Sequence, residues 1–259
     1  MFEEKLTGGN IAASVTRLGM TVRKPTTKAA PAVQNFLSYL HLSGFDGCPQ
    51  PFGLDEQGRQ VLEFIPGTKA HEAGHNIPLD LRRVGALVRE FHSVAASYQP
   101  QTNAVWDSLS AANGQEIICH NDLAPWNLIV GAERWVFIDW DNAAPGTRLW
   151  DLAWTAISFP PVRLDQNLTS LAKAIRAIGD GYGLDLSEYH LLLALMADRA
   201  QAASDHILNG VRNNDPIALR LYAEKHDEYW GPVSNYLRRH SSKLENLILE
   251  NTDTKARES

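Results

Sequence analysis

The sequence is poor in cysteine and has no long apolar run. Its 259 residues include only two cysteines, Cys48 and Cys119, so at most one disulfide can form and a disulfide-stapled secreted fold is excluded. No stretch approaches the roughly 18 apolar residues of a membrane span, and the opening residues MFEEK lack the apolar segment of a signal peptide. We therefore expect a cytoplasmic protein without a membrane partner, in which Cys119 is a buried thiol.

Basic charge is also scarce. The chain carries 24 Lys and Arg residues against 30 Asp and Glu residues, which gives a net charge of −6, and it has no basic cluster. Binding to nucleic-acid phosphates requires such a cluster, so a nucleic-acid partner is not expected. A mildly acidic surface instead suits a small cationic substrate. These numbers leave the oligomeric state open.

What the sequence does contain is a group of three oxygen-bearing side chains near its middle. Asp122 and Asn127 lie in the segment HNDLAPWN, and Asp139 follows the apolar run VFI. Between them, the run LIV and the turn residues GAER predict a short hairpin. The hairpin brings Asp122 and Asp139 together, although they are 17 residues apart in the sequence.

This group of side chains suits phosphoryl transfer. The reaction needs a carboxylate to accept a hydroxyl proton and hard oxygen ligands to hold Mg²⁺ against nucleotide phosphates. The kinase catalytic loop, H-R-D-x-x-x-x-N, has the same five-residue step from Asp to Asn. We predict Asp122 as the catalytic base and Asn127 and Asp139 as the Mg²⁺ ligands. The alternative is that the two Asp residues are buried loop caps.

Two departures from the protein-kinase pattern indicate a subfamily. Asn121 stands where protein kinases have Arg, and Trp140-Asp141 stands where they have Phe-Gly. HNDLAPWN followed by IDWD resembles the aminoglycoside phosphotransferase and choline kinase family, which has a protein-kinase-like fold. The resemblance implies a small-molecule kinase that transfers the γ-phosphate of ATP or GTP to a hydroxyl of an aminoglycoside-like or amino-alcohol substrate.

The resemblance also implies a bilobal α+β fold. We expect a small N-lobe over residues 1–66, made of an antiparallel sheet with one helix, and a larger, mostly helical C-lobe over 67–259. Pro31 and the apolar spacing after it predict the N-lobe helix over 31–42. The C-lobe is expected to hold the catalytic loop and the acceptor pocket.

Several N-lobe residues are candidates for nucleotide binding. Gly8 and Gly9 form a turn between two predicted strands, where a backbone can approach phosphates closely. Val22 and Lys24 are two residues apart on the next strand, so both side chains share a face: Val22 toward the adenine and Lys24 toward the phosphates. Arg23 is the second candidate, and a solvent-facing Arg-Lys pair is the alternative.

The strand that begins at Val61 ends in Pro66-Gly67. In the resembled family this place is the hinge between the lobes, whose backbone binds the purine. The resemblance therefore assigns the backbone groups of Glu63 and Ile65 to the base, although an ordinary strand end would look the same.

The predicted helix over 31–42 contains no Asp or Glu, although protein kinases pair such an acid with the strand lysine. Gln34 is the nearest polar candidate for this role. The missing acid motivates an alternative function, a nucleotide-binding immunity or sensor protein with little or no catalysis. Asp141 is either a second metal-side carboxylate or a loop brace.

One further motif, HEAGH at 71–75, matches the H-E-x-x-H of zinc hydrolases. That chemistry requires a helix, and Gly74 and Pro78 make a helix improbable. We expect a loop there.

After Asp139 the chain reaches Asp151 within twelve residues, which leaves no room for the activation segment of a protein kinase. This spacing favours a small-molecule acceptor. The region from 166 onward is predicted to be helical, with Ser187 capping one helix, Asp215 opening another and a last helix starting near Val233. No acceptor motif is readable in these helices.

Overall fold

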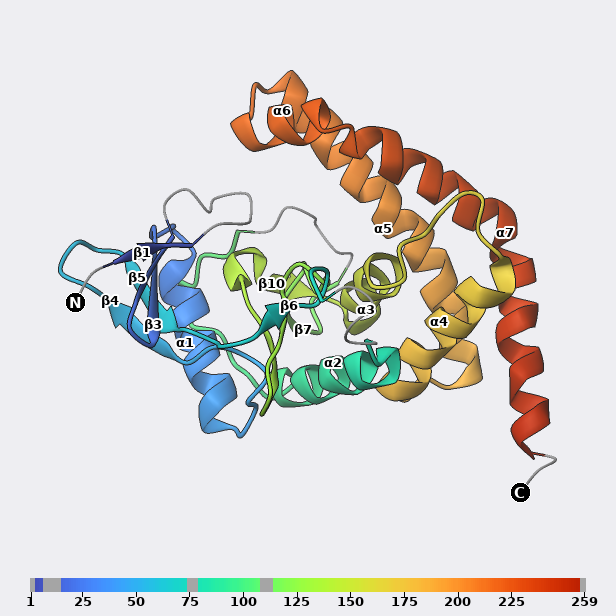
Figure 1. Ribbon diagram of the computed structural model, residues 1–259, viewed down its shortest axis with the longest axis horizontal. Helices are drawn as coiled ribbons and strands as arrows, with labels where there is room; N and C mark the ends of the chain where they lie inside the picture. The colour runs from blue at the N-terminus through green and yellow to red at the C-terminus, as the bar shows by residue number, and fades with distance from the viewer. Residues whose placement is uncertain (1–2, 7–14, 74–78, 108–113, 257–259) are drawn as a thin grey trace. The chain divides into compact units, whose positions relative to one another are not determined.

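The structure is a computed structural model that describes residues 3–6, 15–73, 79–107 and 114–256 (Figure 1). By its contacts the chain divides into two compact units, which we describe separately. Unit 1 comprises Met1–Leu79, Glu90–Ser108 and Asn113–Gly146, and unit 2 comprises Asp80–Arg89, Leu109–Ala112 and Thr147–Ser259. The lobe boundary after residue 66 stays a prediction.

Unit 1 contains a five-stranded sheet in the order β1-β2-β3-β5-β4, in which every neighbouring pair is antiparallel. The strands are β1 (Glu4–Lys5), β2 (Thr16–Leu18), β3 (Thr21–Lys24), β4 (Pro51–Leu54) and β5 (Gln60–Glu63). In the register of β3 and β5, Val22 lies opposite Leu62 and Lys24 lies opposite Gln60. The antiparallel N-terminal sheet predicted from the sequence is confirmed.

Helix α1 (Ala30–Leu42) packs beside this sheet. Pro31 stands at its start, where a missing backbone N–H costs nothing, and Val33, Phe36 and Leu40 lie on its buried face. The prediction of a helix over 31–42 is confirmed to within one residue.

Two smaller antiparallel sheets flank the segments HNDLAPWN and IDWD of unit 1. Strand β7 (Ile117–Cys119) pairs with β10 (Ala144–Gly146), and β8 (Leu128–Val130) pairs with β6 (Thr68–Lys69) and β9 (Trp135–Phe137). The Gly131 N–H donates to Arg134 O at 3.1 Å and closes the predicted hairpin turn. Residues Ala144–Gly146 form a strand because they pair with the edge of β7.

Helix α2 (Leu81–Ala95) contributes residues to both units. Asp80 caps it, accepting from the Arg82 and Arg83 N–H groups at 2.9 and 3.2 Å.

The rest of unit 2 is helical: α3 (Arg148–Ser158), α4 (Leu168–Tyr182), α5 (Leu186–Arg212), α6 (Pro216–Ala223) and α7 (His226–Ala256). Helices α5 and α7 run alongside each other (Figure 1). Asp215 caps α6 as expected. The predicted cap Ser187 is wrong: Asp185 caps α5 and forms a capping box with Glu188.

A polar network joins three helices of unit 2 at Asp180. Its carboxylate accepts from Arg176 Nε at 2.5 Å, from Arg82 at 2.8 Å and from the Tyr189 hydroxyl at 3.0 Å. Arg82 reaches it because α2 and α4 pack closely at Gly85, where a Cβ would lie 2.0 Å from Ile178 O. Burial alone would raise the pKa of Asp180, but these donors outweigh it and lower the pKa.

Replacing Asp180 by Asn is expected to destabilise the protein by about 2 kcal/mol near pH 7, because charge-assisted hydrogen bonds are lost. The folded pKa is lowered, so this contribution is complete above the unfolded pKa of about 3.9 and disappears as pH falls through the folded pKa. Urea unfolding at pH 7 and at pH 3 measures the difference in unfolding free energy between the wild type and Asp180→Asn. We expect this difference to be smaller at pH 3. A difference of equal size at the two pH values contradicts the assignment. Asp205→Asn is the control, because the exposed Asp205 carboxylate accepts from the neutral amide of Gln201 at 2.9 Å.

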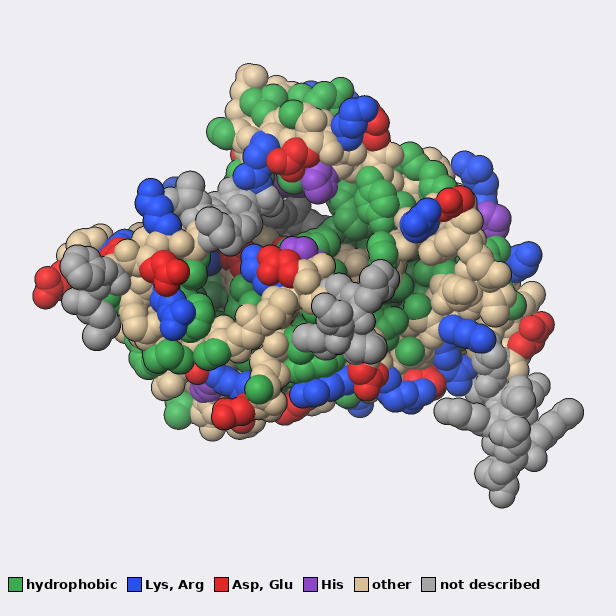
Figure 2. Space-filling view, in the orientation of Figure 1, with side chains coloured by type: hydrophobic (Ala, Val, Ile, Leu, Met, Phe, Trp, Pro, Cys, Tyr) green, Lys and Arg blue, Asp and Glu red, His purple; other side chains and the backbone are tan. Residues whose placement is uncertain are grey.

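Cys48 and Cys119 are both buried, reduced thiols, as predicted for Cys119, and burial raises the pKa of Cys48. Within the described ranges, none of the helices combines the length and apolar character that crossing a bilayer requires. On the face shown in Figure 2, Lys and Arg side chains are interspersed with Asp and Glu side chains.

Candidate active site

The segment 120–127 folds into a compact loop between β7 and β8 that is closed by its own side chains. The Asn127 amide nitrogen donates to Asp122 twice, to the backbone oxygen at 3.1 Å and to Oδ2 at 2.7 Å. The Trp126 indole N–H donates to the same Oδ2 at 3.3 Å. The carboxylate of Asp122 is therefore held in one orientation by two residues of its own loop.

His120 fastens this loop to the strand end that precedes Asp139. Its ring is fully buried and lies 4.5 Å from the ring of Trp140. The Asp122 backbone N–H donates to His120 Nδ1 at 3.2 Å, so the proton is on Nε2, which donates to Ile138 O at 3.1 Å. The Ile138 N–H in turn donates to Asn127 O at 2.8 Å. Asp122, Asn127 and Asp139 are thus joined through one hydrogen-bonded framework.

Two non-glycine residues of this region have left-handed backbones, Asn121 with φ 64° and Asp139 with φ 63°. Asn and Asp are the side chains that tolerate this conformation best. The Asn121 amide nitrogen also donates to Asn142 O at 3.0 Å. The Asn121 side chain therefore supports the backbone at Asn142.

Lys24 on β3 reaches this framework with its ammonium group. Its Nζ lies 2.9 Å from Asp139 Oδ1 and 2.7 Å from Asp141 Oδ2. Burial alone would lower the pKa of Lys24, but the two carboxylates outweigh it and raise the pKa. Lys24 therefore stays charged at neutral pH. Arg23, the second candidate, instead lies 3.7 Å from Asp55.

Asp139 is held in its ionised form. Desolvation would raise its pKa, but the charge of Lys24 and its hydrogen bond lower the pKa below the usual range. The side chain is 54% exposed, so its carboxylate can reach a ligand from outside the protein.

The other predicted nucleotide-binding residues are placed as follows. Val22 lies on β3, two residues before Lys24. The Glu63 backbone N–H donates to Gln50 O at 2.8 Å, and its side chain binds Arg134 at 2.5 Å, so a base contact would have to use the Glu63 carbonyl. Ile65 is buried against Ile129 and Val136. Gly8 and Gly9 lie outside the described residues.

Gln34 does not serve as the partner of Lys24. Its side-chain oxygen accepts from the Gly53 N–H at 3.1 Å, whereas Lys24 binds Asp139 and Asp141. Sequence reasoning assigned no definite role to Asp141 and did not identify the contact from Trp126 to Asp122. For Asp141 the available signal was its place two residues beyond Asp139.

Trp140 anchors the segment that carries Asp139 and Asp141. It is 3% exposed, and its indole N–H donates to Phe137 O at 2.7 Å. Its ring lies 6.0 Å from that of Phe36 on α1 and 4.9 Å from that of Phe91 on α2. Through Trp140, the segment that carries Asp139 and Asp141 packs against buried aromatic side chains of unit 1.

The HEAGH motif does not form a metal site in the described residues. His71 and Glu72 lie in a turn rather than a helix, and Ala73 is buried. Residues 74–78, which include His75, lie outside the described part of the chain. Among the described residues, no group of three His, Cys, Asp or Glu side chains could hold a metal.

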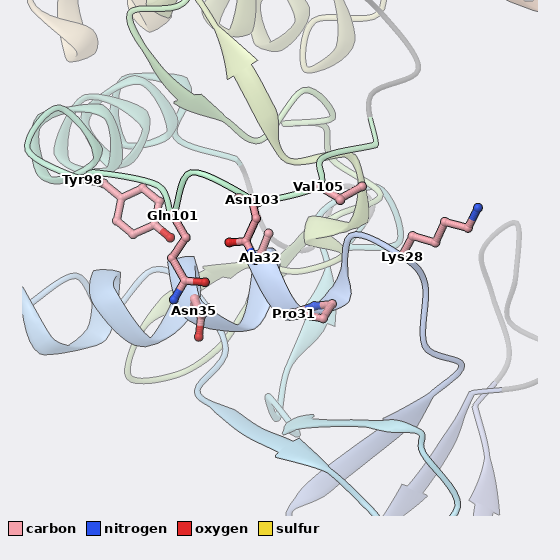
Figure 3. A pocket seen from close by; sticks show the side chains of 9 residues that line it. Lys28, Pro31, Ala32, Asn35, Tyr98, Gln101, Asn103 and Val105 are labelled. Carbon is pink, nitrogen blue, oxygen red and sulfur yellow. The ribbon is translucent and has the colours of Figure 1, made fainter.

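A pocket of about 220 Å³ lies beside α1, lined in part by Asn35, Tyr98 and Gln101 (Figure 3). Its lining includes none of Lys24, Asp122, Asn127 and Asp139. In Figure 3 the Lys28 side chain extends away from the other labelled side chains. The pocket is therefore separate from the candidate active-site residues.

The sequence of this chain matches a protein-family model and a known protein. A family model described as "Phosphotransferase enzyme family" matches residues 99–192, which include the 120–127 loop and Asp139. The Trifolitoxin immunity protein of Rhizobium leguminosarum bv. trifolii is 31% identical over 193 residues, covering 69% of this chain and 73% of that protein.

Solved structures match the fold over most of the chain. A choline/ethanolamine kinase family protein from Mesorhizobium loti is 15% identical, with a TM-score of 0.63 over 96% of this chain and 93% of that one. An amicoumacin kinase in complex with AMP-PNP, Ca²⁺ and Ami is 12% identical, with a TM-score of 0.62 over 88% and 87%. A microcompartment-associated aminopropanol kinase is 14% identical, with a TM-score of 0.58 over 89% of each chain. The predicted kinase-like fold is confirmed.

Proposed function

Because this chain belongs to the phosphotransferase enzyme family, we propose that it is a small-molecule kinase using ATP or GTP as phosphate donor. The acceptor is a hydroxyl of an amine-bearing compound, such as an aminoglycoside-like molecule or an amino alcohol. The observation that carries the proposal is the framework that joins Asp122, Asn127 and Asp139 and receives Lys24.

Asp122 is the catalytic base of the proposed reaction. It orients the acceptor hydroxyl and takes its proton as the hydroxyl oxygen attacks the γ-phosphorus in line. The bond from the γ-phosphorus to the bridging oxygen breaks, and the nucleoside diphosphate leaves. The fixed orientation of the Asp122 carboxylate supports this role, and general-base help is worth roughly 10²–10⁴ in rate.

Asn127 and Asp139 are the residues that would hold Mg²⁺. The Asn127 amide nitrogen is committed to Asp122, which leaves its carbonyl oxygen to face a cation, and Asp139 supplies an ionised carboxylate. An amide oxygen and a carboxylate are the hard donors that Mg²⁺ prefers. When bound, Mg²⁺ neutralises charge on the nucleotide phosphates.

The remaining nucleotide contacts are assigned to unit 1. Lys24 binds the phosphates and Val22 packs against the base. Gly8 and Gly9, which the sequence also assigns to the phosphates, lie outside the described residues. The backbone groups of Glu63 and Ile65 bind the base.

The acceptor is proposed to be small and amine-bearing. Asp139 and Asp151 are twelve residues apart, and β10 takes up part of that interval, which leaves no length for a peptide-binding segment. The net charge of −6 suits a cationic acceptor. Similarity to an aminopropanol kinase and an amicoumacin kinase supports the same choice.

A second candidate function is favoured by the immunity relative. In it, the protein gives protection against a toxin by binding rather than by catalysis, with nucleotide as a bound ligand. The absence of an acid on α1 favours this candidate, whereas the carboxylate partner that Asp141 supplies to Lys24 favours catalysis.

The proposed function is tested with the purified protein, Mg²⁺ and ATP or GTP, against a panel of hydroxyl-bearing amines preselected by thermal shift. We expect Mg²⁺-dependent transfer to at least one amine, and Asp139→Asn is expected to lower turnover by about 10²-fold or more, because it removes charge where the phosphates are neutralised. Phosphate transfer is measured by coupled assay and mass spectrometry.

Asp46→Asn, an exposed substitution of the same chemistry in unit 1, is the control and is expected to match the wild type. Equal turnover in Asp139→Asn and the wild type argues against the proposed metal ligand. Tight Mg²⁺-nucleotide binding with no transfer and no hydrolysis favours the binding-only immunity function.

A further inference from the structure

We propose that Asp141 is the residue that positions Lys24 toward the nucleotide phosphates, in the place of an acid on helix α1. The inference rests on the proposed kinase function and assigns a definite role to a side chain outside the Asp122, Asn127 and Asp139 set. We infer that the ion pair between Lys24 and Asp141 persists when ligand binds, whereas the ion pair between Lys24 and Asp139 breaks.

The first support is the contact geometry. The Lys24 ammonium bridges two carboxylates, with the shorter distance, 2.7 Å, to Asp141 Oδ2 and 2.9 Å to Asp139 Oδ1. Both are charge-assisted contacts of good length. Because Lys24 has two carboxylate partners, it keeps one ion pair when the contact with the other carboxylate is broken.

The two carboxylates differ in exposure, and this difference assigns their roles. The Asp141 side chain is 19% exposed and the Lys24 side chain is 13% exposed, whereas Asp139 is 54% exposed. The accessible carboxylate is the one that incoming ligands can reach. The less exposed Asp141 is therefore the carboxylate that keeps its 2.7 Å contact with the Lys24 ammonium.

Helix α1 offers Lys24 no alternative anchor. Its 13 residues, APAVQNFLSYLHL, include no Asp or Glu, and the buried Gln34 is engaged with the Gly53 N–H. The described partners of Lys24 are therefore Asp139 and Asp141.

Asp141 is itself held from both sides. It lies in the short helix η3 (Trp140–Asn142), between the buried Trp140 and Asn142, whose backbone oxygen accepts from the Asn121 amide. A supported residue of this kind can fix the position of a flexible lysine side chain.

The test measures nucleotide binding by calorimetry, with ATP and GTP, once in EDTA and once with Mg²⁺. Asp141→Asn is expected to weaken binding of the nucleotide bound by the wild type by about ten-fold in both conditions, because the contact from Lys24 to phosphate does not require metal. Weakening only with Mg²⁺ overturns the inference and makes Asp141 a metal-side carboxylate.

A double-mutant cycle with Lys24→Met separates positioning from a general structural effect. If Asp141 acts through Lys24, Asp141→Asn adds less than about two-fold to the loss caused by Lys24→Met. Full additivity overturns the inference. Asp141→Glu, which keeps the charge, is expected to recover part of the affinity, and Asp46→Asn is the matched control.

The outcomes also separate this inference from the proposed function. If the wild type transfers phosphate and Asp141→Asn binds nucleotide as the wild type does, the positioning role fails alone. If the wild type binds neither nucleotide in either condition, the kinase proposal fails and the inference falls with it.

Discussion

Replacing Asp122 by Asn lowers turnover by roughly 10²–10⁴-fold and leaves nucleotide affinity within about two-fold of the wild type. Asn has nearly the same shape, and its carbonyl oxygen can accept the hydrogen bonds that Asn127 and Trp126 now donate to Asp122 Oδ2. The loop therefore keeps its fold, but the amide cannot accept the proton of an acceptor hydroxyl. Steady-state rates with a saturating acceptor, together with calorimetric nucleotide binding, measure the two effects separately.

Asp46→Asn is the control for this substitution, since it makes the same chemical change at an exposed site of unit 1. Turnover that survives Asp122→Asn within a few-fold shows that Asp122 is not the base. A loss of nucleotide affinity equal to the loss of turnover assigns Asp122 to binding instead.

Replacing Trp140 by Ala destabilises the protein by about 3–5 kcal/mol, the usual cost of removing a large core aromatic side chain. The indole is nearly fully buried, packs against Phe36, Phe91 and His120, and satisfies Phe137 O with its N–H. Its loss leaves a cavity and an unpaired carbonyl beneath the segment that carries Asp139. Urea unfolding followed by fluorescence and by circular dichroism measures the change.

Trp140→Phe separates the two parts of this effect. It keeps an aromatic ring but loses the donor to Phe137 O, and we expect about 1–2 kcal/mol of destabilisation. Leu42→Ala removes an apolar side chain that is 89% exposed on α1, and it serves as the control with a change below about 0.5 kcal/mol. A change of that small size in Trp140→Ala would mean that the aromatic cluster contributes little.

Local sequence patterns predicted much of unit 1. The 3.6-residue spacing after Pro31 was sufficient for α1, because the apolar stripe and the terminal proline agree. The alternation of a β-strand separated Lys24 from Arg23, and the structure shows Lys24 on Asp139 and Arg23 near Asp55.

Features that depend on distant partners were not readable. Asp141 and Lys24 are 117 residues apart in the sequence, and neither residue alone indicates the pairing. Strand β10 forms because β7 pairs with it, and its residues APG have low strand propensity.

Helix ends were the other source of error. Asp185 and Ser187 are both good capping residues, and Glu188, three residues after Asp185, was the signal that selects Asp185. Helix α7 begins at His226 rather than near Val233, because it continues through Pro232. Proline usually marks a first turn, so the sequence favoured the later start.

The left-handed backbone at position 121 restricts which amino acids can replace Asn121. Gly would adopt that conformation but has no side chain, and an ionised Asp would adopt it but has no hydrogen to give Asn142 O. Asn meets both demands, whereas β-branched residues are strained there. Position 121 is therefore a practical marker for finding further chains that build their catalytic loop in this way, and for separating them from kinases that carry Arg at that point.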